Sequence, residues 1–250
     1  MRAFILTALA AMAIAAPAYA GPVHVFGPGG PAPAMKEAAA TFSKLRGVSV
    51  EVVAGPTSEW IEAARQTGDV IYSGSETMMT DLQAAMGDRI DPATITPLYL
   101  RVSNILVRPG NPGKIRGLND LFRPGHRVLV VNGAGQNGLW EDMAGRTGEI
   151  AKVRALRSNI IRYAKNSAEA KQVWTADTSL DAWIIWGIWQ KANPALADAV
   201  PVEQSYRIYR DVGSGLTAAG KSNPDALAFA EWLTTPAAQA IFVKWGWEAN

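Results

Sequence analysis

The chain has 250 residues, a formal net charge of +2, two histidines and no cysteine. Hydrophobic residues make up 48% of it, which is enough apolar material for a sizeable buried core. The nearly balanced charge argues against nucleic acid as a partner, because phosphate binding requires a concentrated basic face. The absence of cysteine excludes disulfides, a thiolate nucleophile and a cysteine-ligated metal site.

Residues 1–20 have the pattern of a secretory signal peptide. Arg2 gives a positive start, a run rich in Ala, Leu and Ile follows, and Ala18, Tyr19 and Ala20 form a small-x-small cleavage pattern. The alternative is a membrane anchor, but the apolar run is shorter than the ~20 residues that a spanning helix needs. We therefore expect cleavage before Gly21 and a periplasmic location.

Strand-like and helix-like segments alternate in the first part of the remaining chain. The expected strands are residues 22–27, 48–55 and 68–74, and the expected helices are residues 33–47, 57–68 and 76–86. Thr57 or Ser58 is expected to cap the second helix. This alternation is typical of a parallel sheet covered by helices, so we predict an α/β fold.

The pattern then changes in a way that predicts two lobes. Residues 95–115 and 200–217 are long β-rich runs that flank a middle α/β block. We expect a chain that leaves one lobe, builds another and returns, with lobe 1 formed by residues 21–100 plus 206–250 and lobe 2 by residues 101–205. A cleft between two such lobes is a usual place for a ligand.

Four loops follow strands and run directly into helices, and they are rich in Gly, Ser, Thr or Asn. They are residues 27–33, 54–60, 72–79 and 131–140. Free N–H groups and the helix dipole favour anions at helix N-termini beyond the carboxyl ends of strands. A single loop of this kind is more often a plain helix start. Four such loops, each between a strand and the helix that follows it, predict a site for an anion or a polar small molecule.

The first of these loops, GPGGPAP, matches neither the phosphate loop of nucleotide hydrolases nor the dinucleotide fingerprint. Its glycines Gly29 and Gly30 allow the backbone to approach a ligand closely, while Pro31 and Pro33 stiffen the turn into the helix. Hydroxyl groups in the next two loops add uncharged donors. These hydroxyl groups belong to Thr57, Ser58, Ser73 and Ser75.

Motifs that span nearly the whole chain after residue 20 carry a family resemblance. They include GPGGPAPAMKEAA, AGPTSEWIEAA, DVIYSGSETMMTD, LVRPGNPGKIRGLNDL, VVNGAGQNGLWEDMAGR, DAWIIWGIWQ and YRDVGSGLT. With these motifs the sequence resembles the extracellular solute-binding proteins of the periplasm, in the two-lobed group that includes molybdate and sulfate binders. More closely, it resembles the accessory colonization factor C family.

The resemblance implies a type 2-like periplasmic-binding-protein fold with a ligand cleft between the lobes. It also implies a monomer that binds a small anionic ligand and serves a membrane transporter permease or a chemoreceptor. In the molybdate-binding relatives, loop donors hold a tetrahedral oxyanion, and a tyrosine of those relatives aligns with Trp186. The ligand-binding residues expected from the loops and the resemblance are Gly29, Gly30, Thr57, Ser58, Ser73, Gly74, Ser75, Arg101, Ala134, Gly135, Gln136, Asn137, Asn166, Ser167 and Trp186.

Arg101 lies in the first β-rich crossing and has two readings. It is either a cleft arginine that pairs with a carboxylate or sulfate, or a solvated hinge arginine. Arg210, in the second crossing, has the same two readings. A cleft arginine would favour a di- or tricarboxylate over a metal oxyanion, and we expect that class slightly ahead of sulfate or molybdate.

Two other classes of function fit the sequence less well. A periplasmic hydrolase would use Ser73 or Ser75, but neither His24 nor His126 lies in a nucleophile-elbow or metal-ligand pattern. A surface interaction or adhesion factor would not need several glycine and hydroxyl loops at strand ends. We therefore expect a non-enzymatic binding protein with no cofactor and no metal. The tryptophans Trp183, Trp186 and Trp189 recur in one helix-like segment, where core packing is their commonest role.

Overall fold

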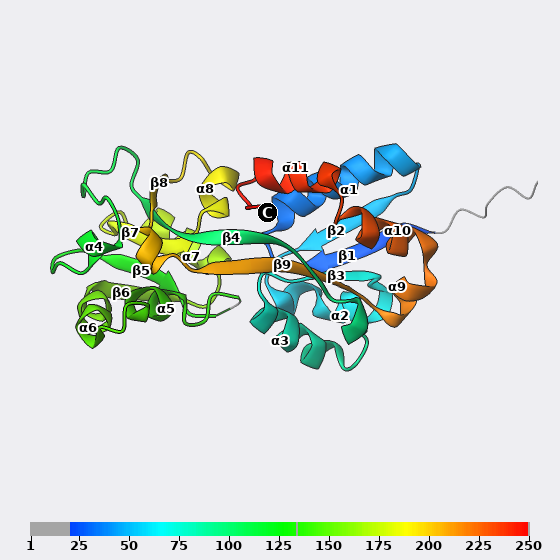
Figure 1. The fold of residues 1–250 in the computed structure, drawn as a ribbon, viewed down its shortest axis with the longest axis horizontal. Helices are drawn as coiled ribbons and strands as arrows, with labels where there is room; N and C mark the ends of the chain where they lie inside the picture. The colour runs from blue at the N-terminus through cyan, green and yellow to red at the C-terminus, as the bar shows by residue number, and fades with distance from the viewer. Residues whose placement is uncertain (1–20, 134, 250) are drawn as a thin grey trace, which may run out of the picture.

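The computed structural model describes residues 21–133 and 135–249 (Figure 1). The expected signal peptide, residues 1–20, and the predicted site residue Ala134 lie outside the described residues. The strands are β1 Val23–Gly27, β2 Val50–Ala54, β3 Val70–Tyr72, β4 Thr96–Val107, β5 Val128–Val131, β6 Ile160–Ala164, β7 Ala182–Trp186, β8 Asp198–Pro201 and β9 Tyr209–Leu216. The α-helices are α1 Ala32–Arg46, α2 Thr57–Thr67, α3 Glu76–Met86, α4 Leu118–Leu121, α5 Leu139–Gly145, α6 Ile150–Asn159, α7 Ser167–Ala176, α8 Ile188–Ala192, α9 Ala218–Ser222, α10 Pro224–Trp232 and α11 Pro236–Lys244. Short 3-10 turns occupy Pro92–Thr94 and Gln204–Tyr206.

The predicted two-lobed α/β architecture is confirmed by the order of the strands. They follow one path, β2-β1-β3-β9-β4-β7-β5-β6, with β8 paired to β4. Strands β1, β2 and β3 are parallel and form lobe 1, whereas β5, β6 and β7 are parallel and form lobe 2. The long antiparallel strands β4 and β9 run from one lobe into the other and form the bridge between them (Figure 1).

The partners of β4 change close to the expected lobe boundary. Its first part, from Thr96 to Val102, pairs with β9, whereas the part from Ser103 to Val107 pairs with β7. We propose residues 21–100 plus 206–250 as lobe 1 and residues 101–205 as lobe 2, because the change of partner falls within a few residues of that division.

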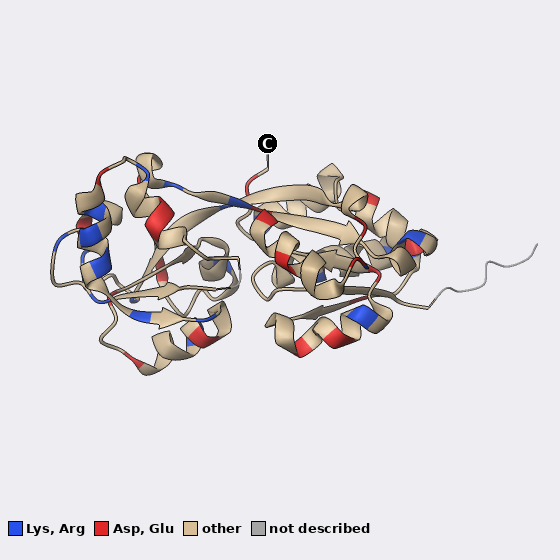
Figure 2. Cartoon of the chain, turned by 90° about the horizontal axis from the view of Figure 1, so that it is seen from below, with Lys and Arg blue, Asp and Glu red and all other residues tan. Residues whose placement is uncertain are grey.

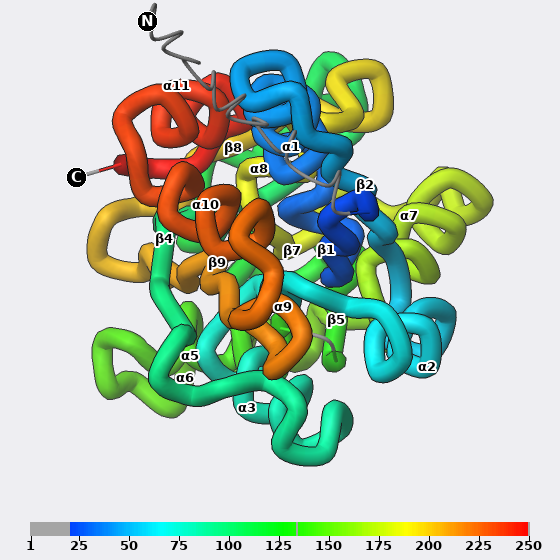
Figure 3. Tube along the Cα trace, turned by 90° about the vertical axis from the view of Figure 1, so that its right-hand side faces the viewer, coloured from blue at the N-terminus to red at the C-terminus, as the bar shows by residue number. Residues whose placement is uncertain are grey.

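Helices cover both faces of the lobe 1 sheet, which explains why its inner strands are almost entirely apolar. Figure 3 looks at the lobe 1 end of the molecule, with α1, α10 and α11 on one side of the strands and α2 and α3 on the other. Val25 of β1 and Ile71 of β3 are fully buried. The helices α10 and α11 begin at Pro224 and Pro236, which agrees with the preference of proline for the first helical turn.

Two local predictions are wrong. The segment with three tryptophans is not a single helix: Trp183 and Trp186 belong to strand β7, and Trp189 belongs to helix α8. The run AWIIW is apolar throughout, and the period of such a short run does not distinguish a buried strand from a helix. Pro56, not Thr57 or Ser58, occupies the N-cap position of helix α2, no side chain caps the helix, and Thr57 is its first helical residue.

Within the described residues, no single helix has the length and apolar composition of a membrane span. Only α10 and α11 taken together meet those criteria, and they are bent by 64° at the break between them.

Candidate ligand-binding site

A cavity of about 90 Å³ lies between loops of the two lobes. Roughly 10–15 Å³ of such volume holds one water molecule, so the cavity accommodates a small solute of several heavy atoms. Predicted site residues that line it are Gly29, Gly30, Thr57, Gly74, Arg101, Gly135, Gln136, Asn166 and Ser167. The sequence placed these residues in six separate segments, and the fold brings them to one place.

Four helices begin at this cavity, and their N-termini give it a positive potential. Helices α1, α2 and α3 contribute from lobe 1, through Pro31, Thr57 and Gly74, and helix α7 contributes from lobe 2, through Ser167. The first N–H groups of each helix have no partner within the helix, and the aligned peptide dipoles add partial positive charge at that end. The arrangement therefore favours a bound anion.

Arg101 supplies the only formal charge among the described residues that line the cavity. Its side chain is buried, with 4% exposure, and its Nη2 donates a hydrogen bond to the carbonyl oxygen of Gly74. The guanidinium carbon lies 4.4 Å from the ring centre of Trp186 and 5.6 Å from that of Trp247. The alternative of a solvated hinge arginine is therefore wrong.

The charge of Arg101 is not neutralised by a direct ion pair within the described part of the chain. Its Nε has no hydrogen-bond partner there. Burial lowers the pKa of Arg101 to about 9, while the nearby Asp211 carboxylate raises that pKa and Arg210 lowers it. The side chain is therefore cationic at neutral pH. A buried cation without a bonded counterion is strongly stabilised by an anion that enters the cavity.

Two glycines allow the backbone to pass close to this guanidinium. A β-carbon at Gly74 would lie 2.8 Å from Arg101 Nη2, and one at Gly30 would lie 3.3 Å from Arg101 Nη1 and 3.6 Å from Trp189 Nε1. Any side chain at Gly74 would thus displace the guanidinium. The sequence predicted that Gly30 allows the backbone to approach a ligand, and the close neighbours of Gly30 in the structure are Arg101 and side chains of helix α8.

The lobes touch each other around the cavity. A β-carbon at Gly135, which has a positive φ of 55°, would lie 3.4 Å from Ser75 Oγ and 3.5 Å from Arg101 Nη2. A second contact to lobe 2 is made by Arg210, whose Nη2 donates to Asp142 Oδ2 of helix α5 at 2.6 Å. Arg210 therefore forms a surface ion pair outside the cavity and is not among the residues that line it.

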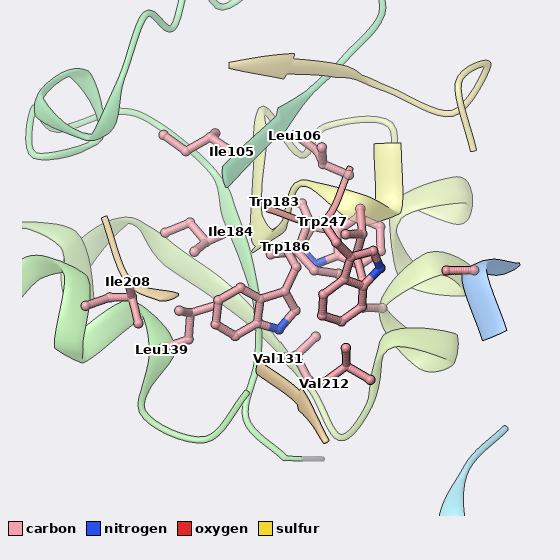
Figure 4. Packing of buried hydrophobic residues seen from close by; sticks show 14 of the residues in the cluster. Ile105, Leu106, Val131, Leu139, Trp183, Ile184, Trp186, Ile208, Val212 and Trp247 are labelled. Carbon is pink, nitrogen blue, oxygen red and sulfur yellow. The ribbon is translucent and has the colours of Figure 1, made fainter. Parts of the chain in front are cut away.

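The remaining predicted residues lie near the cavity without lining it. Ser58 lines a separate hollow beside Thr57, and Ser75 caps helix α3 by accepting from the N–H of Met78. Ser73 is fully buried, and Asn137 is exposed. Trp186 is fully buried behind Arg101, and Figure 4 shows its ring beside Leu139 inside the apolar cluster.

Trp189 lines the cavity and was not among the predicted site residues. The prediction chose Trp186 because a tyrosine of the molybdate-binding relatives aligns with it, and it placed all three tryptophans in one helix-like segment. The chain changes instead from strand to helix at Gly187, so Trp189 reaches the cleft. The glycine between the two tryptophans was the only local signal for this break. Pro28, Pro31, Gly55, Pro56, Met78 and Ala168 also line the cavity.

A two-lobed fold with an anion-favouring cavity between its lobes defines a class of solute-binding protein, and the comparisons agree. Residues 23–248 match the family described as bacterial extracellular solute-binding protein, and the chain belongs to that family. The expectation of an extracellular solute-binding protein is confirmed. A search of curated protein sequences finds no match.

Several solved structures are similar to this chain. PEB3 from Campylobacter jejuni has 34% sequence identity and a TM-score of 0.85 over 91% of this chain and 100% of its own. A crystal structure of PEB3 with bound L-phospholactate has 34% identity and a TM-score of 0.86 at the same coverage. The sulfate-binding protein SubI from Mycobacterium tuberculosis has 19% identity and a TM-score of 0.75 over 91% of this chain and 86% of its own, a likeness of fold alone. The periplasmic molybdate-binding protein of Azotobacter vinelandii has 17% identity and a TM-score of 0.69 over 91% of this chain and 99% of its own, again a likeness of fold alone.

Proposed function

We propose that this protein binds a small anion reversibly in the cavity between its lobes, in the periplasm, and presents it to a membrane transporter permease or a chemoreceptor. The observation that carries this proposal is the buried guanidinium of Arg101, which has no ion-pair partner in the described residues and faces a cavity at four helix N-termini. Such a site is stabilised by negative charge and by little else.

The proposed ligand class is a small oxyanion or carboxylate, including molecules that carry both groups. The named ligands of the structural neighbours, phospholactate, sulfate and molybdate, all carry anionic oxygens, which supports this class. The donors proposed to hold it are Arg101, the backbone N–H groups at Gly29 and Gly30, and the hydroxyl groups of Thr57 and Ser167. Charge-assisted bonds from arginine are stronger than neutral ones and are suited to paired oxygens.

We propose binding without chemistry. Ser73 and Ser75 were the candidate nucleophiles of the alternative hydrolase, and Ser75 Oγ is engaged as the cap of helix α3. The family and the named neighbours are binding proteins, which supports the same view.

The test is a thermal-shift series on purified protein with sulfate, molybdate, phosphate, dicarboxylates, tricarboxylates and phospholactate. A ligand that binds only the folded state raises the melting temperature in a concentration-dependent manner. We expect at least one of these anions to do so, whereas uncharged sugars of similar size leave the melting temperature unchanged. A melting temperature that none of the anions raises would contradict the proposal.

A further inference from the structure

The side chain of Gln136 has a feature that simple anion binding does not explain. Gln136 lines the cavity from the lobe 2 loop after β5 and is 95% buried, since its exposed fraction is 5%. Its Nε2 donates to Ser167 Oγ at 2.6 Å, and its Oε1 has no hydrogen-bond partner in the described structure. A buried amide oxygen without a donor costs about 1–3 kcal/mol, so a donor is expected to reach it when the site is filled.

Several other acceptors of residues that line the cavity are already in use. The carbonyl oxygen of Gly74 accepts from Arg101, that of Gly55 accepts from Trp60 Nε1 at 3.1 Å, and that of Pro28 accepts from the Tyr72 hydroxyl at 3.1 Å. The amide oxygen of Asn166 accepts from the N–H of Glu169 at 2.9 Å. Gln136 Oε1 is thus a buried acceptor without a partner in the described structure, on a residue that lines the cavity.

From this we infer that the natural ligand carries a hydrogen-bond donor, a hydroxyl group or a protonated oxygen, beside its anionic group, and that Gln136 selects for it. The inference rests on the proposed anion-binding function and narrows its ligand class. Fully ionised sulfate and molybdate only accept hydrogen bonds, so they leave Oε1 without a partner. A hydroxy acid, a phosphorylated hydroxy acid or hydrogen phosphate supplies the missing proton.

The magnitude of this selection follows from the cost of an unmade bond. A site that offers a polar group rejects an analogue that lacks the matching donor, because the buried group of the site is then left unpaired. A neutral hydrogen bond of about 0.5–1.5 kcal/mol corresponds to roughly a two- to tenfold preference.

The experiment is isothermal titration calorimetry at pH 7 with matched ligand pairs that differ in one donor. The pairs are malate and succinate, citrate and tricarballylate, and hydrogen phosphate and sulfate. We expect the donor-bearing member of each pair that binds to be preferred by about two- to tenfold in the unmodified protein. In Gln136→Met, which keeps the length of the side chain but removes the amide, the ratio within each pair falls to about one.

Asn137→Ala is the matched control for this experiment. Asn137 is exposed and does not line the cavity, so its replacement leaves both the Gln136 amide and its partner Ser167 in place, and the ratio within each pair persists. Far-ultraviolet circular dichroism and the melting temperature establish that both variants are folded.

Two results overturn the inference while leaving the proposed function intact. One is equal affinity within every pair that binds to the unmodified protein. The other is a loss on Gln136→Met that is as large for succinate and sulfate as for their partners, because the amide would then act as a donor to the anion. If no member of any pair binds, the proposed function and the inference fail together.

Discussion

Arg101 sets the charge of the cleft, so its replacement is the most informative change at the scale of a single residue. Arg101→Met keeps much of the volume packed on Trp186 and Trp247 and removes the cation. Hydrogen bonds to charged groups contribute about 1.5–3 kcal/mol, so the affinity for the bound anion should fall by roughly ten- to a hundredfold. Calorimetric titration of the variant and the unmodified protein measures this, and an unchanged affinity would remove Arg101 from the site.

The pH dependence of binding follows from the same residue. Burial lowers the pKa of Arg101 to about 9, below that of an exposed arginine, so the free folded protein loses this proton before an unfolded chain does. Between pH 7 and 8 the guanidinium is charged and the anion affinity should be flat for ligands whose own charge is constant. Above about pH 9 the affinity should fall. Titrations with sulfate or succinate, which do not change charge in this range, provide the measurement, and a constant affinity up to pH 10.5 would contradict this assignment.

The stability of the folded state changes with pH in the opposite direction to the anion affinity. The unfolded chain keeps the Arg101 proton above pH 9, where the folded protein releases it, so the unfolded state binds more protons there. Arg101 alone therefore makes the folded state of the unliganded protein relatively more stable as pH rises through its folded pKa. Loss of binding above pH 9 should consequently not be accompanied by unfolding caused by this group.

At the scale of an element, the loop between β3 and α3 holds the guanidinium in place. Gly74→Ala puts a methyl group 2.8 Å from Arg101 Nη2, so the guanidinium must shift and its bond to the Gly74 carbonyl is disturbed. We expect the anion affinity to fall about tenfold or more. Gly145→Ala in helix α5 is a suitable control, because its added carbon meets only Val153 at 3.7 Å. Equal affinities in the two variants would show that this loop does not position Arg101.

Helices and strands with a regular hydrophobic period, or with clear start and stop residues, could be predicted from the sequence. The parallel strands β1, β2 and β3 alternate with helices of regular length, and the β-rich crossings became β4 and β9. The run AWIIW could not be assigned, because five consecutive apolar residues suit a buried strand and a buried helix equally. The cap of α2 was misassigned because Thr57 and Ser58 are good caps in isolation, whereas Pro56 ends the preceding extended segment.

Within the site, the glycine loops and helix starts were predictable because their residue types directly reflect backbone requirements. The roles of Arg101 and Trp189 were not, since both depend on contacts between distant segments. Arg101 is buried only because Trp186, Trp247 and Gly74 converge on it from β7, the C-terminal segment and the loop after β3. Trp189 reaches the cavity only because β7 ends one residue before Gly187. No local pattern encodes such convergence.

For the whole molecule, the ion pair between Arg210 and Asp142 joins a crossing strand to lobe 2 and should stabilise the closed arrangement. Both side chains are about a third or more exposed, so its contribution is at most about 1 kcal/mol. Asp142→Asn should therefore weaken anion affinity by no more than about fivefold, and the effect should diminish at high salt. An affinity loss much larger than this, or one that salt does not change, would contradict the assignment of this contact as an exposed ion pair that weakly stabilises the closed arrangement.

The charge distribution supports a cleft with one central cation. Arg101 is the only buried Lys or Arg among the described residues. Figure 2 shows that many of the other Lys and Arg positions are at the end of lobe 2 remote from lobe 1. Arg101 is the only charged residue among those described at the cavity. Binding of one anion thus compensates one buried charge.

We expect the two lobes to close around the bound anion. Small-angle X-ray scattering should therefore show a smaller radius of gyration with ligand than without it. An unchanged radius in saturating ligand would contradict closure of the lobes on binding.

The central claim, reversible binding of a small anion by the buried Arg101, is tested most directly by calorimetric titration of the best ligand from the thermal-shift series. The titration compares the unmodified protein with Arg101→Met. The account predicts one site per chain in the unmodified protein and an affinity at least tenfold weaker in the variant, with both proteins folded. Equal affinities, or no binding of any tested anion to the unmodified protein, would contradict it.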